Sequence, residues 1–380
     1  MRKTVGVFGC GLVGQLIAKE LSRDYLVNVY DHSQVALDKM MDTPFCHGYL
    51  ADLSDTDEVR RTVLANDLIV CAVPGSMGYK IITICAEQGK KAADISFSPT
   101  DPLQLNDLAK TTGARIVVDC GVAPGMSNLF AGHIYNKIDE LDKITIMVGG
   151  LPLKRTWPFE YNLVFSLTDV LEEYTRPSRF IENYRVITRP ALSDREFVDL
   201  PKCDTLEAFN TDGLRTLLTT LNVPNMIEKT LRFPGHIDKM MVFREAGFFD
   251  DVDIEVDGRE MNPRKLTEKL FTKCWILPKD EGEFTVLRVE GIRHSADGRP
   301  HWVTWDLYDQ TRGGQTSMAR TTGLPCATML RLLDKSDWIE PGVWPLELLA
   351  DNQKIVDCLV GELELHEIQI TCSDNQNHTI

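Results

Sequence analysis

The stretch Thr4-Val5-Gly6-Val7-Phe8-Gly9-Cys10-Gly11-Leu12-Val13-Gly14 decides the fold of this chain. A short apolar strand runs into the pattern G-x-G-x-x-G, and an amphipathic helix is expected over residues 12–22. In such a unit the first glycine permits a tight turn, the second lets the backbone approach a pyrophosphate, and the third lets helix and strand pack closely. The helix directs its N-terminal amides at the phosphates. The stretch predicts a dinucleotide site made of Gly9, Gly11, Leu12, Val13 and Gly14.

An acidic residue closes the second predicted strand, which covers 26–31. Asp31 lies about twenty residues after the first glycine, where a carboxylate binds the ribose hydroxyls of the adenosine half. His32, Ser33 and Gln34 follow it, and no arginine lies close to it in the sequence. Because a carboxylate repels a 2′-phosphate, we expect NAD rather than NADP. The alternative is a structural glycine turn in some other α/β protein.

Strands and helices continue to alternate as far as residue 119. The expected strands cover 45–50, 67–73, 92–95 and 115–119, and the expected helices cover 54–64, with Ser54 as N-cap, 81–88 and 102–110. Continuous apolar strands that alternate with helices predict a parallel, doubly wound Rossmann sheet. Ligands bind beyond the carboxyl ends of such strands. This rule selects 52–53, 72–74, 94–97 and 119–122 as cofactor or substrate loops, and we assign Asp52, Leu53, Val73 and Pro74 to the cofactor.

The pattern becomes irregular near residue 125. Expected strands cover 143–148, 284–294 and 302–309, the last two joined by the hairpin signal Asp297-Gly298, and an expected helix covers 265–275. A long helix is expected over 315–333, interrupted near Gly323-Leu324-Pro325, and its small residues suit packing against the first domain. In 363–371 apolar and polar residues alternate, which predicts a last strand. We predict an α/β chain with a Rossmann domain (1–125), an inserted α+β domain (126–312) and a C-terminal segment (313–380) that returns to the Rossmann domain.

Composition excludes several classes of function. A net charge of −15 argues against binding to nucleic acid or to anionic membranes, because both require a basic surface. No apolar run approaches the roughly 18 residues of a membrane span, and the immediate first strand leaves no room for a signal peptide, so we expect a cytoplasmic protein. The ten cysteines are scattered singly, so we expect reduced thiols and no metal site. An antiparallel second sheet makes a homodimer the natural expectation.

Four ordered motifs resemble those of the saccharopine dehydrogenase-like family. Segment 119–128 (DCGVAPGMSN) is similar to the family's G-x-x-P-G-x-x-N/H signature, and 149–152 (GGLP) resembles its GGLP turn. Segment 231–236 (LRFPGH) is similar to L-R-Y/F-P-G, and 318–325 (MARTTGLP) resembles M-A-[KR]-T-x-G-x-P. With the glycine pattern, the resemblance covers residues 4 to about 345.

The resemblance implies NAD(P)-dependent chemistry at an amine-bearing carbon, in a Rossmann domain with an inserted domain for substrate and dimerisation. Ser96 and Phe97 would face the substrate beside the nicotinamide. Gly121 and Val122 would line the cofactor, and Ser166 would approach the cofactor or the substrate. The resemblance also implies that Arg215 and Arg232 hold substrate carboxylates, although the residues around Arg215 depart from the pattern of the reductase branch. Arg320 is a third candidate for holding a substrate carboxylate, and a surface or interface position is the alternative for each of the three arginines.

Within the family, a single compact chain of this size resembles the lysine 6-dehydrogenases. We therefore expect oxidative deamination of L-lysine at its ε-amine, which gives the semialdehyde and then the cyclic imine. One alternative is a reductase that joins an amine and a carbonyl, as in saccharopine or carboxynorspermidine formation. Another alternative, from a different class, is a non-catalytic NAD-sensing protein.

The reaction requires a group that accepts a proton. Asp94 and Asp119 each close a predicted strand at the edge where ligands bind, and His236 follows a Pro-Gly turn and would titrate near neutral pH. We take these three residues as catalytic candidates. The alternatives are loop-anchoring aspartates and a structural histidine.

Overall fold

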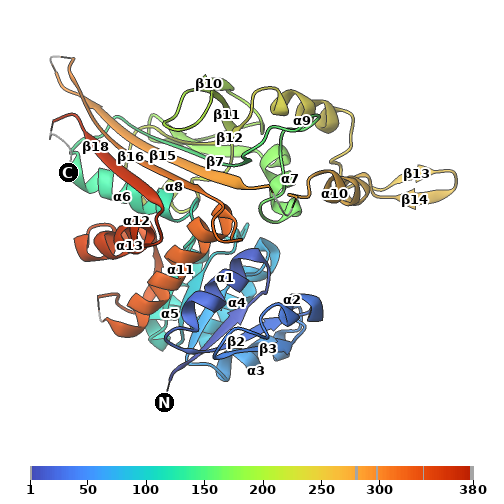
Figure 1. The fold of residues 1–380 in the computed structure, drawn as a ribbon. Helices are drawn as coiled ribbons and strands as arrows, with labels where there is room; N and C mark the ends of the chain where they lie inside the picture. The colour runs from blue at the N-terminus through green and yellow to red at the C-terminus, as the bar shows by residue number, and fades with distance from the viewer. Residues whose placement is uncertain (1, 279–280, 297, 337, 377–380) are drawn as a thin grey trace. The chain divides into compact units, whose positions relative to one another are not determined.

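The computed structural model describes residues 2–278, 281–296, 298–336 and 338–376, and they form two compact units (Figure 1). The first consists of Met1–Asp139, Arg215–Leu221 and Ala319–Ile370, and the second of Glu140–Leu214, Asn222–Met318 and Thr371–Ile380. The first unit thus extends beyond residue 125, where a boundary was predicted. It also includes a short piece, 215–221, from the middle of the region predicted as the second domain.

Parallel strands form the centre of the first unit. Within the described residues the sheet has seven strands in the order β17-β6-β5-β4-β1-β2-β3. Their bounds are β1 Thr4–Phe8, β2 Leu26–Asp31, β3 Cys46–Leu50, β4 Leu68–Cys71, β5 Lys91–Asp94, β6 Arg115–Val118 and β17 Gly342–Pro345. Every neighbouring pair is parallel, which confirms the predicted doubly wound sheet. Only β17 was not predicted, because four residues carry too little pattern.

The helices of the first unit include α1 Leu12–Leu21, α2 Gln34–Asp38, α3 Thr56–Leu64, α4 Gly75–Glu87, α5 Asn106–Thr112, α6 Met126–Lys137, α8 Leu217–Thr220, α12 Leu346–Leu349 and α13 Gln353–Leu365, with a 3₁₀ turn at Pro102–Leu105. Helices α1 and α3 lie within two residues of the predicted bounds, α4 begins six residues before its predicted start, and the predicted helix over 102–110 is a 3₁₀ turn followed by α5. Helices α2, α6, α8, α12 and α13 were not predicted. The prediction of Ser54 as N-cap was wrong. The cap of α3 is Asp55, whose carboxylate accepts a hydrogen bond from the Asp57 N–H.

Helix α11 (Ser317–Lys335) lies against the Rossmann sheet's first helix. A Cβ on Gly323 would lie 2.8 Å from Leu16 Cδ2 of α1, so glycine allows this close approach without a shift of the leucine side chain. The predicted interruption near Pro325 was wrong, since the helix continues through that residue. Proline removes a single backbone hydrogen bond, while Cys326, Met329 and other residues on the following turns are fully buried. Burial of this face outweighs the lost bond.

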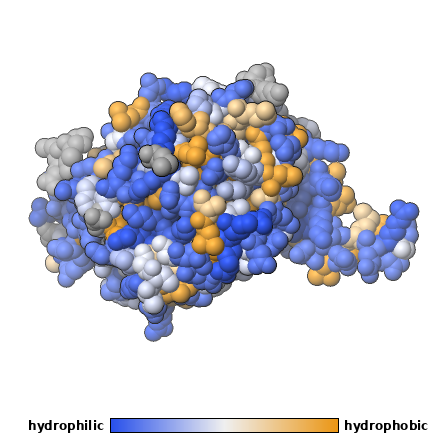
Figure 2. Space-filling view, turned by 90° about the horizontal axis from the view of Figure 1, so that it is seen from below, coloured by the Kyte–Doolittle hydropathy of each residue, from blue (hydrophilic) through white to orange (hydrophobic). Residues whose placement is uncertain are grey.

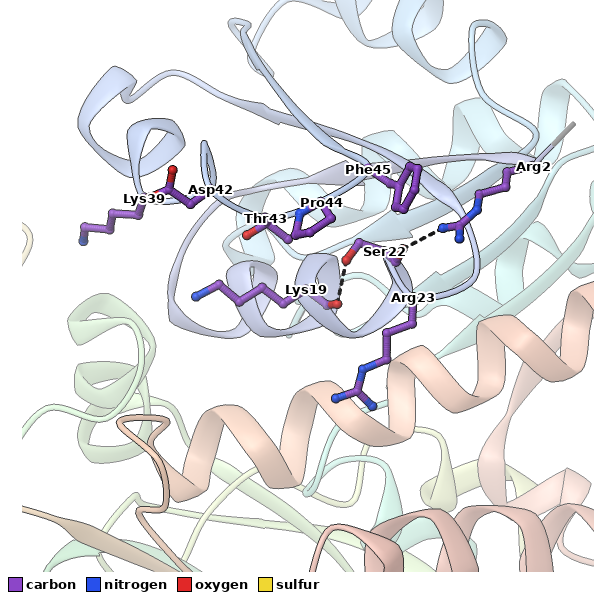
Figure 3. Close-up of a pocket in the computed structure, with 9 residues that line it drawn as sticks. All are labelled: Arg2, Lys19, Ser22, Arg23, Lys39, Asp42, Thr43, Pro44 and Phe45. Carbon is purple, nitrogen blue, oxygen red and sulfur yellow. Dashed lines mark hydrogen bonds between the residues drawn. The ribbon is translucent and has the colours of Figure 1, made fainter.

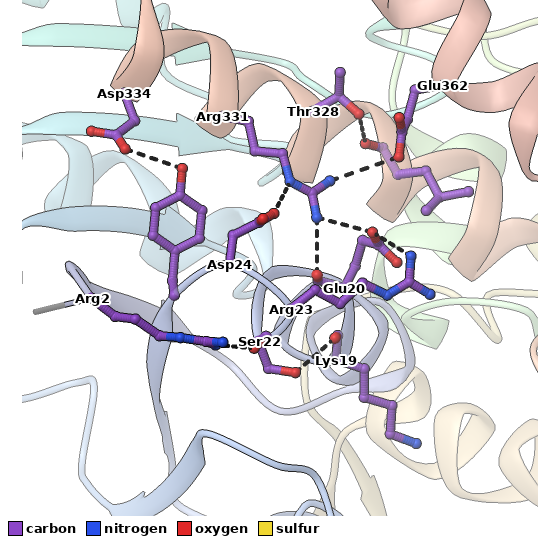
Figure 4. Close-up of polar contacts among 12 residues, drawn as sticks. Arg2, Lys19, Glu20, Ser22, Arg23, Asp24, Thr328, Arg331, Asp334 and Glu362 are labelled. Atoms are coloured by element: carbon purple, nitrogen blue, oxygen red, sulfur yellow. Dashed lines mark hydrogen bonds and ion pairs between the residues drawn. The ribbon is translucent and has the colours of Figure 1, made fainter.

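Charged groups also join α11 to α1 (Figure 4). The Arg331 guanidinium lies 2.9 Å from a Glu20 carboxylate oxygen and 2.8 Å from one of Asp24, and its other end faces Glu362 at 3.8 Å. Tyr25 donates a hydrogen bond of 3.1 Å to Asp334. Glu20 and Glu362 also approach His366 closely enough to share a cation, but Arg331 already supplies the positive charge at this position.

A mixed sheet forms the second unit. Among the described residues it contains nine strands, with the path β10-β11-β12-β7-β15-β16-β18, and β8 pairs with β12 and β9. Their bounds are β7 Lys143–Pro152, β8 Ser178–Glu182, β9 Arg185–Arg189, β10 Glu196–Val198, β11 Leu206–Asn210, β12 Met226–Arg232, β15 Glu283–His294, β16 Pro300–Gln310 and β18 Gln369–Asp374. β12 and β7 run parallel, whereas β10–β11, β11–β12, β12–β8, β8–β9, β7–β15 and β15–β16 are antiparallel, which confirms the predicted α+β character.

Three helices and a separate hairpin complete the second unit as far as it is described: α7 Leu167–Thr175, α9 His236–Glu245, α10 Pro263–Cys274, and the pair β13 Ile254–Val256 and β14 Arg259–Met261. Aromatic side chains fill the core between these helices, with Trp275 and Phe271 ring centroids 4.3 Å apart. Of the predicted turn between β15 and β16, Asp297 lies outside the described residues, and Gly298 has φ of 80°.

The prediction of a last strand over 363–371 was partly wrong. Residues 363–365 end helix α13, and β18 begins at Gln369. Ile355, Leu359 and Leu363 are buried at a spacing of four residues, which is the helical period. The alternation of the short segment was thus a weaker signal than the longer helical pattern before it. No helix in the described part of the chain is long and apolar enough to cross a membrane.

Candidate functional site

The glycine turn after β1 is held by backbone contacts at two of its three glycines. Gly9 has φ of 102°, and a Cβ on it would lie 2.3 Å from the Ala72 carbonyl oxygen. A Cβ on Gly14 would lie 2.1 Å from the Gly9 carbonyl oxygen. A Cβ on Gly11, by contrast, would meet no described atom within 4 Å. The fold thus requires Gly9 and Gly14, whereas Gly11 leaves open space in front of the turn.

This open space lies at the N-terminus of α1. Gly11 is the N-cap, and no side chain caps the first amides of the helix. Leu12 is 53% exposed beside it, and Val13 is half-buried. Unoccupied amides at a helix start bind anions such as a pyrophosphate. The turn therefore fits the diphosphate of a dinucleotide.

Asp31 joins the end of β2 to the same turn. One carboxylate oxygen accepts a hydrogen bond of 2.7 Å from the Cys10 N–H, and the other accepts one of 2.8 Å from the Ser33 N–H. Each carboxylate oxygen has a second lone pair for a further donor. The carboxylate is half-buried next to the turn, which is the geometry that ribose hydroxyls require.

The other predicted cofactor residues also follow strands of this sheet. Asp52 is exposed after β3, and hydrogen bonds from the Ser54 side chain and backbone lower the pKa of its carboxyl group. Leu53 and Val73 are buried, and Pro74 is the exposed N-cap of α4. Because the strands are parallel, these loops lie at one edge of the sheet.

Close contacts continue along this edge from β4 to β5. A Cβ on Gly75 would lie 2.1 Å from the Phe97 carbonyl oxygen, and one on Gly78 would lie 1.7 Å from Ser96 Oγ. The start of α4 therefore packs directly on the loop after β5. This contact places the predicted substrate residues Ser96 and Phe97 beside the loop that carries Val73 and Pro74.

Two predicted site residues, Asp119 and Arg215, form a buried ion pair. Arg215 Nε donates to Asp119 Oδ2 at 3.2 Å, and Nη2 donates to Oδ1 at 2.9 Å. Nη1 donates to the Ser98 carbonyl oxygen, and the guanidinium carbon lies 4.7 Å from the centre of the Phe97 ring. The Arg215 side chain is 6% exposed and that of Asp119 is 1% exposed. The substrate candidate and the catalytic candidate thus bind each other.

Asp94 anchors the loop that follows it. Its carboxylate accepts a 3.0 Å hydrogen bond from the Ser96 N–H, two residues on, as in an Asx-turn. Burial raises the pKa of Asp94 to about 6, and the charge of Asp119 adds to this shift. Hydrogen bonds from the Ser96 and Cys71 side chains oppose the shift in the pKa of Asp94. This geometry favours the anchoring alternative for Asp94, while its raised pKa is suited to proton transfer near neutral pH.

The loop after β6 is closed by contact between two glycines. Gly125 has φ of 142°, and its Cβ would lie 2.0 Å from the Gly121 carbonyl oxygen. Gly121 and the buried Val122 each form a bridge with Gly125, and Asn128 then accepts from the Gly125 N–H at 3.2 Å. The spacing of the G-x-x-P-G-x-x-N segment follows from this turn. Gly121 and Val122 follow Asp119 by two and three residues, and their role in binding the cofactor stays a prediction.

The second unit contains the remaining candidates in a buried polar cluster. Arg232 is 2% exposed, forms an ion pair with Glu173 and lies 4.6 Å from the centre of the Tyr161 ring. Burial opposes the charge of Arg232, but Glu173 and two tyrosines outweigh it and raise its pKa. Ser166 caps α7 by accepting from the Asp169 N–H at 3.4 Å. These contacts favour structural roles within this unit.

His236 has both ring nitrogens occupied. Nδ1 lies 2.8 Å from the Phe159 carbonyl oxygen and must donate to it, so Nε2 accepts from the Tyr174 hydroxyl at 3.0 Å. Burial, together with the charge of Arg232, lowers the pKa of His236 to about 3. The neutral ring is thus fixed in one tautomer, which favours the structural alternative over a catalytic base.

A cavity of about 730 Å³ on the first unit lies away from the glycine turn. Four basic side chains, those of Arg2, Lys19, Arg23 and Lys39, line it around Phe45 (Figure 3). Arg2 and Phe45 precede β1 and β3, so this cavity is at the amino edge of the sheet, whereas the predicted cofactor loops follow the strands. It is not the predicted dinucleotide site.

Comparison with known proteins identifies the family. The model for "Saccharopine dehydrogenase C-terminal domain" matches residues 121–368, more than half of the chain. The chain belongs to this family. The matched region confirms the resemblance seen in the motifs. It includes the candidate residues Gly121, Ser166, Arg215, Arg232 and His236.

Two curated relatives and one solved structure are similar to the chain. It is 23% identical over 222 residues to alpha-aminoadipic semialdehyde synthase of Arabidopsis thaliana, covering 52% of this chain and 20% of the relative. It is 21% identical over 212 residues to saccharopine dehydrogenase [NADP(+), L-glutamate-forming] of Pyricularia oryzae, and this match covers 53% of this chain and 47% of the relative. Each match therefore spans less than half the length of the curated relative.

The structural match covers nearly the whole chain. Apo saccharopine dehydrogenase (L-Glu forming) from Saccharomyces cerevisiae superposes with a TM-score of 0.81 at 16% identity, over 98% of this chain and 99% of that one. This likeness confirms the fold, with a parallel Rossmann sheet and a second mixed sheet.

One residue of the first unit was missed by the sequence reasoning. Glu347 is 2% exposed in α12 and accepts hydrogen bonds from Asn128 and Thr220. The available signal was a lone acidic residue in the otherwise apolar run 343–350. An isolated charge in such a run indicates a buried, hydrogen-bonded group.

Gly11→Ala should separate cofactor binding from folding. The open space at Gly11 accepts a methyl group, so the midpoint of thermal unfolding should stay unchanged, while NADH affinity should fall about tenfold or more because the methyl group displaces the diphosphate. Gly14→Ala is the matched control and should lower the unfolding midpoint through its clash with Gly9. Unchanged NADH affinity in Gly11→Ala, measured by fluorescence titration, would contradict this site.

Asp94→Asn should change how stability depends on pH. The folded protein keeps the Asp94 proton up to about pH 6, whereas the unfolded chain loses it near pH 4, so wild type loses stability as the pH rises through this window. Asparagine can still accept the Ser96 N–H bond. The free energy of unfolding of the variant relative to wild type should increase by about 2 kcal/mol between pH 4 and pH 7, measured by urea denaturation.

Asp67→Asn is the control of opposite sign. A backbone hydrogen bond from Thr4 lowers the pKa of Asp67, so its carboxylate stabilises the fold above the unfolded pKa. This variant should lose stability relative to wild type as the pH rises through the same region. Parallel pH curves for wild type and Asp94→Asn would overturn the assignment for Asp94.

Proposed function

We propose that the chain is an oxidoreductase that uses a nicotinamide dinucleotide at a carbon–nitrogen bond of an amino acid. The observation that supports this most strongly is the shared edge of the parallel sheet. There the glycine turn follows β1, Asp31 closes β2, and Asp119, which is paired with Arg215, follows β6. Membership of the saccharopine dehydrogenase C-terminal domain family is consistent with it. The bound nicotinamide would supply hydride transfer to or from the amine-bearing carbon.

NAD is the proposed cofactor. A dinucleotide on such a sheet spans the crevice beside the first strand, with its adenosine ribose at the end of the second. Asp31 occupies this position, and its negative charge disfavours the 2′-phosphate of NADP. The name of the Pyricularia relative specifies NADP(+) for that protein, so NADP use is the outcome that would contradict the proposal.

The chemistry assigned to this chain's residues begins with Arg215. A planar guanidinium can present two parallel N–H groups to a carboxylate, and Asp119 occupies the edge formed by Nε and Nη2, so the proposal places a substrate carboxylate at the edge formed by Nη1 and Nη2. Asp119 and the Phe97 ring hold the guanidinium in one orientation. Asp94, with a pKa raised by burial, is the proposed group for holding a proton near neutral pH.

Two substrates fit this class of reaction. Oxidative deamination of L-lysine at the ε-amine is the proposal that follows from the resemblance in chain size. A saccharopine-type reaction, which joins or separates an amine and a carbonyl compound, is the second candidate, and the names of the relatives favour it. Both involve a carbon–nitrogen bond and at least one carboxylate.

Product analysis separates the candidates. The purified protein is incubated with NAD or NADP and either L-lysine or saccharopine, and NADH or NADPH absorbance is followed with assays for ammonia and glutamate. Ammonia formed in equal amount to NADH from lysine supports deamination. Glutamate without ammonia from saccharopine supports the second candidate. Tight NADH binding without turnover of any amine would favour the NAD-sensing alternative.

Arg215→Lys should weaken substrate use. Lysine keeps the positive charge but cannot form the two-point contact with Asp119 or a planar match to a carboxylate. We expect kcat/KM to fall by about tenfold or more, mainly through KM, with NADH affinity changed less than about twofold. Arg179→Lys is the matched control, because Arg179 forms a similar two-point pair with Asp212 at 2.8 Å in the second unit. Equal effects of the two variants would contradict the role of Arg215.

The expected homodimer, the cytoplasmic location and the absence of nucleic-acid or membrane partners stay predictions. The hairpin β13–β14 carries exposed apolar side chains at Ile254, Val256 and Met261, and Figure 2 shows hydrophobic residues among hydrophilic ones on this projecting part. A two-stranded hairpin is marginally stable alone. Covering it in a dimer would be consistent with the prediction, which size-exclusion chromatography with light scattering tests.

A further inference from the structure

The piece 215–221 is a short crossing of the chain into the first unit. Residues before Arg215 and after Leu221 belong to the second unit. Arg215 itself has φ of 54°, a left-handed conformation that costs free energy for a residue other than glycine. Such a conformation persists only where the surrounding structure holds it. Asp119 holds the Arg215 side chain, and contacts of the helix that follows hold its backbone.

Glu347 anchors the helix α8 that follows Arg215. Thr220 Oγ1 donates to Glu347 Oε1 at 2.8 Å, and Asn128 Nδ2 donates to Glu347 Oε2 at 3.0 Å. Asn128 Nδ2 also lies 3.4 Å from Thr216 Oγ1. Thr216 is the N-cap of α8 and Thr220 is its last residue. The Asn128 amide therefore contacts the start of this helix, and the Glu347 carboxylate contacts its end.

Strand pairing brings Glu347 to this position. β17 pairs in parallel with β6, and Pro345 lies opposite Val118. Asp119 follows Val118 directly, and Glu347 follows Pro345 by two residues. The ends of two neighbouring strands thus carry the two carboxylates, and Asp119 holds the Arg215 side chain while Glu347 holds the backbone segment behind it.

The charge of Glu347 is unusual for a purely structural residue. It is 2% exposed, and none of the ion pairs between described residues includes it. Burial raises the pKa of Glu347, while its hydroxyl and amide donors oppose the shift. A buried carboxylate without a cationic partner destabilises a fold unless hydrogen bonds compensate for it. Its donors here belong to the segment that carries Arg215 and to the α6 motif residue Asn128.

We infer that Glu347 is a positioning residue that fixes Arg215 against Asp119 by clamping Thr220 and Asn128. It does not contact the reacting atoms. Its consequence for catalysis rests on the proposed function, whereas its effect on the position of Arg215 does not. A substrate carboxylate would bind a guanidinium that is already oriented. Weaker hydrogen bonds to Glu347 would let Arg215 move and so weaken substrate binding, although every group that contacts the substrate would still be present.

Glu347→Gln tests the clamp with little change in shape. The glutamine oxygen would accept from the Asn128 amide, and its amide nitrogen would face Thr220 Oγ1. That hydroxyl can accept from the amide while it donates to the Thr216 carbonyl oxygen 2.9 Å away, so a hydrogen bond to a carboxylate is replaced by a weaker one between neutral groups. Full-length wild type and variant are treated with phenylglyoxal, which modifies accessible guanidinium groups, and the rate at each arginine is followed by peptide mass spectrometry. Arg215 should react several-fold faster in the variant, as expected when one hydrogen bond to a charged group is weakened.

Arg320 is the internal reference. It is 4% exposed in the same unit, and its guanidinium donates to the His366 carbonyl oxygen. Its rate should stay within about twofold of wild type. Equal acceleration of Arg215 and Arg320 would mean general loosening of the unit and would overturn the inference. Unchanged reactivity of Arg215 would overturn it as well.

Thr220→Val keeps the inference testable if Glu347→Gln folds poorly. It removes the hydroxyl that bonds to Glu347 and conserves side-chain shape, so the rate at Arg215 should rise in the same direction. Thr328→Val is its matched control, because Thr328 is a buried threonine in the same unit whose hydroxyl donates to the Leu324 carbonyl oxygen at 2.9 Å. That variant should leave the rate at Arg215 unchanged.

Kinetics add a second readout. With an active substrate, Glu347→Gln should raise KM several-fold with a smaller change in kcat, as Arg215→Lys does, and NADH affinity should stay unchanged. A fall in kcat alone would contradict a positioning role through Arg215. If no amine is turned over, the proposed function fails while the labelling result still decides the inference.

Discussion

Close backbone contact at the glycine turn is the constraint on which the first unit depends. Gly9 leaves no room for a side chain against the Ala72 carbonyl oxygen, and Gly14 leaves none against Gly9 itself. Asp31 adds a hydrogen bond from the Cys10 N–H to the end of the second strand. The ends of β1, β2 and β4 and the start of α1 are thereby held together, and Gly11 faces open space where a diphosphate fits.

Farther along the same edge of the sheet, buried polar groups form hydrogen bonds and ion pairs with one another. Asp119 and Arg215 neutralise each other at a distance of 2.9 Å, and Asp94 holds the N–H of Ser96. Buried charges persist in folded proteins when they are paired or hydrogen-bonded. The edge is thus organised before any ligand arrives, and an anionic group that binds there meets an arginine whose orientation is already set by an aromatic ring and a carboxylate.

Local sequence patterns predicted most strands and helices of the Rossmann sheet. They failed where a single residue argued against a longer pattern, or where a segment was too short to show a period. The strands from β1 to β6 and helix α1 were predicted because apolar runs and glycine turns are strong over short windows. Pro325 suggested a break in α11, but a buried helix face outweighs one lost backbone bond. β17 has four residues, too few for any period to show, and its place in the sheet depends on pairing with β6.

The sequence by itself determined the dinucleotide turn, the acidic residue that closes the second strand and the family motifs, because each of these depends on residues close together in the chain. It also identified Asp94, Asp119, Arg215, Arg232 and His236 as candidates. Only the tertiary structure decided that Asp119 binds Arg215, that His236 is a neutral buried ring, and that Glu347 lies behind the arginine. In each case the contacting residues lie tens to hundreds of positions apart in the chain. Such contacts depend on strand order and burial, which a local sequence pattern does not predict.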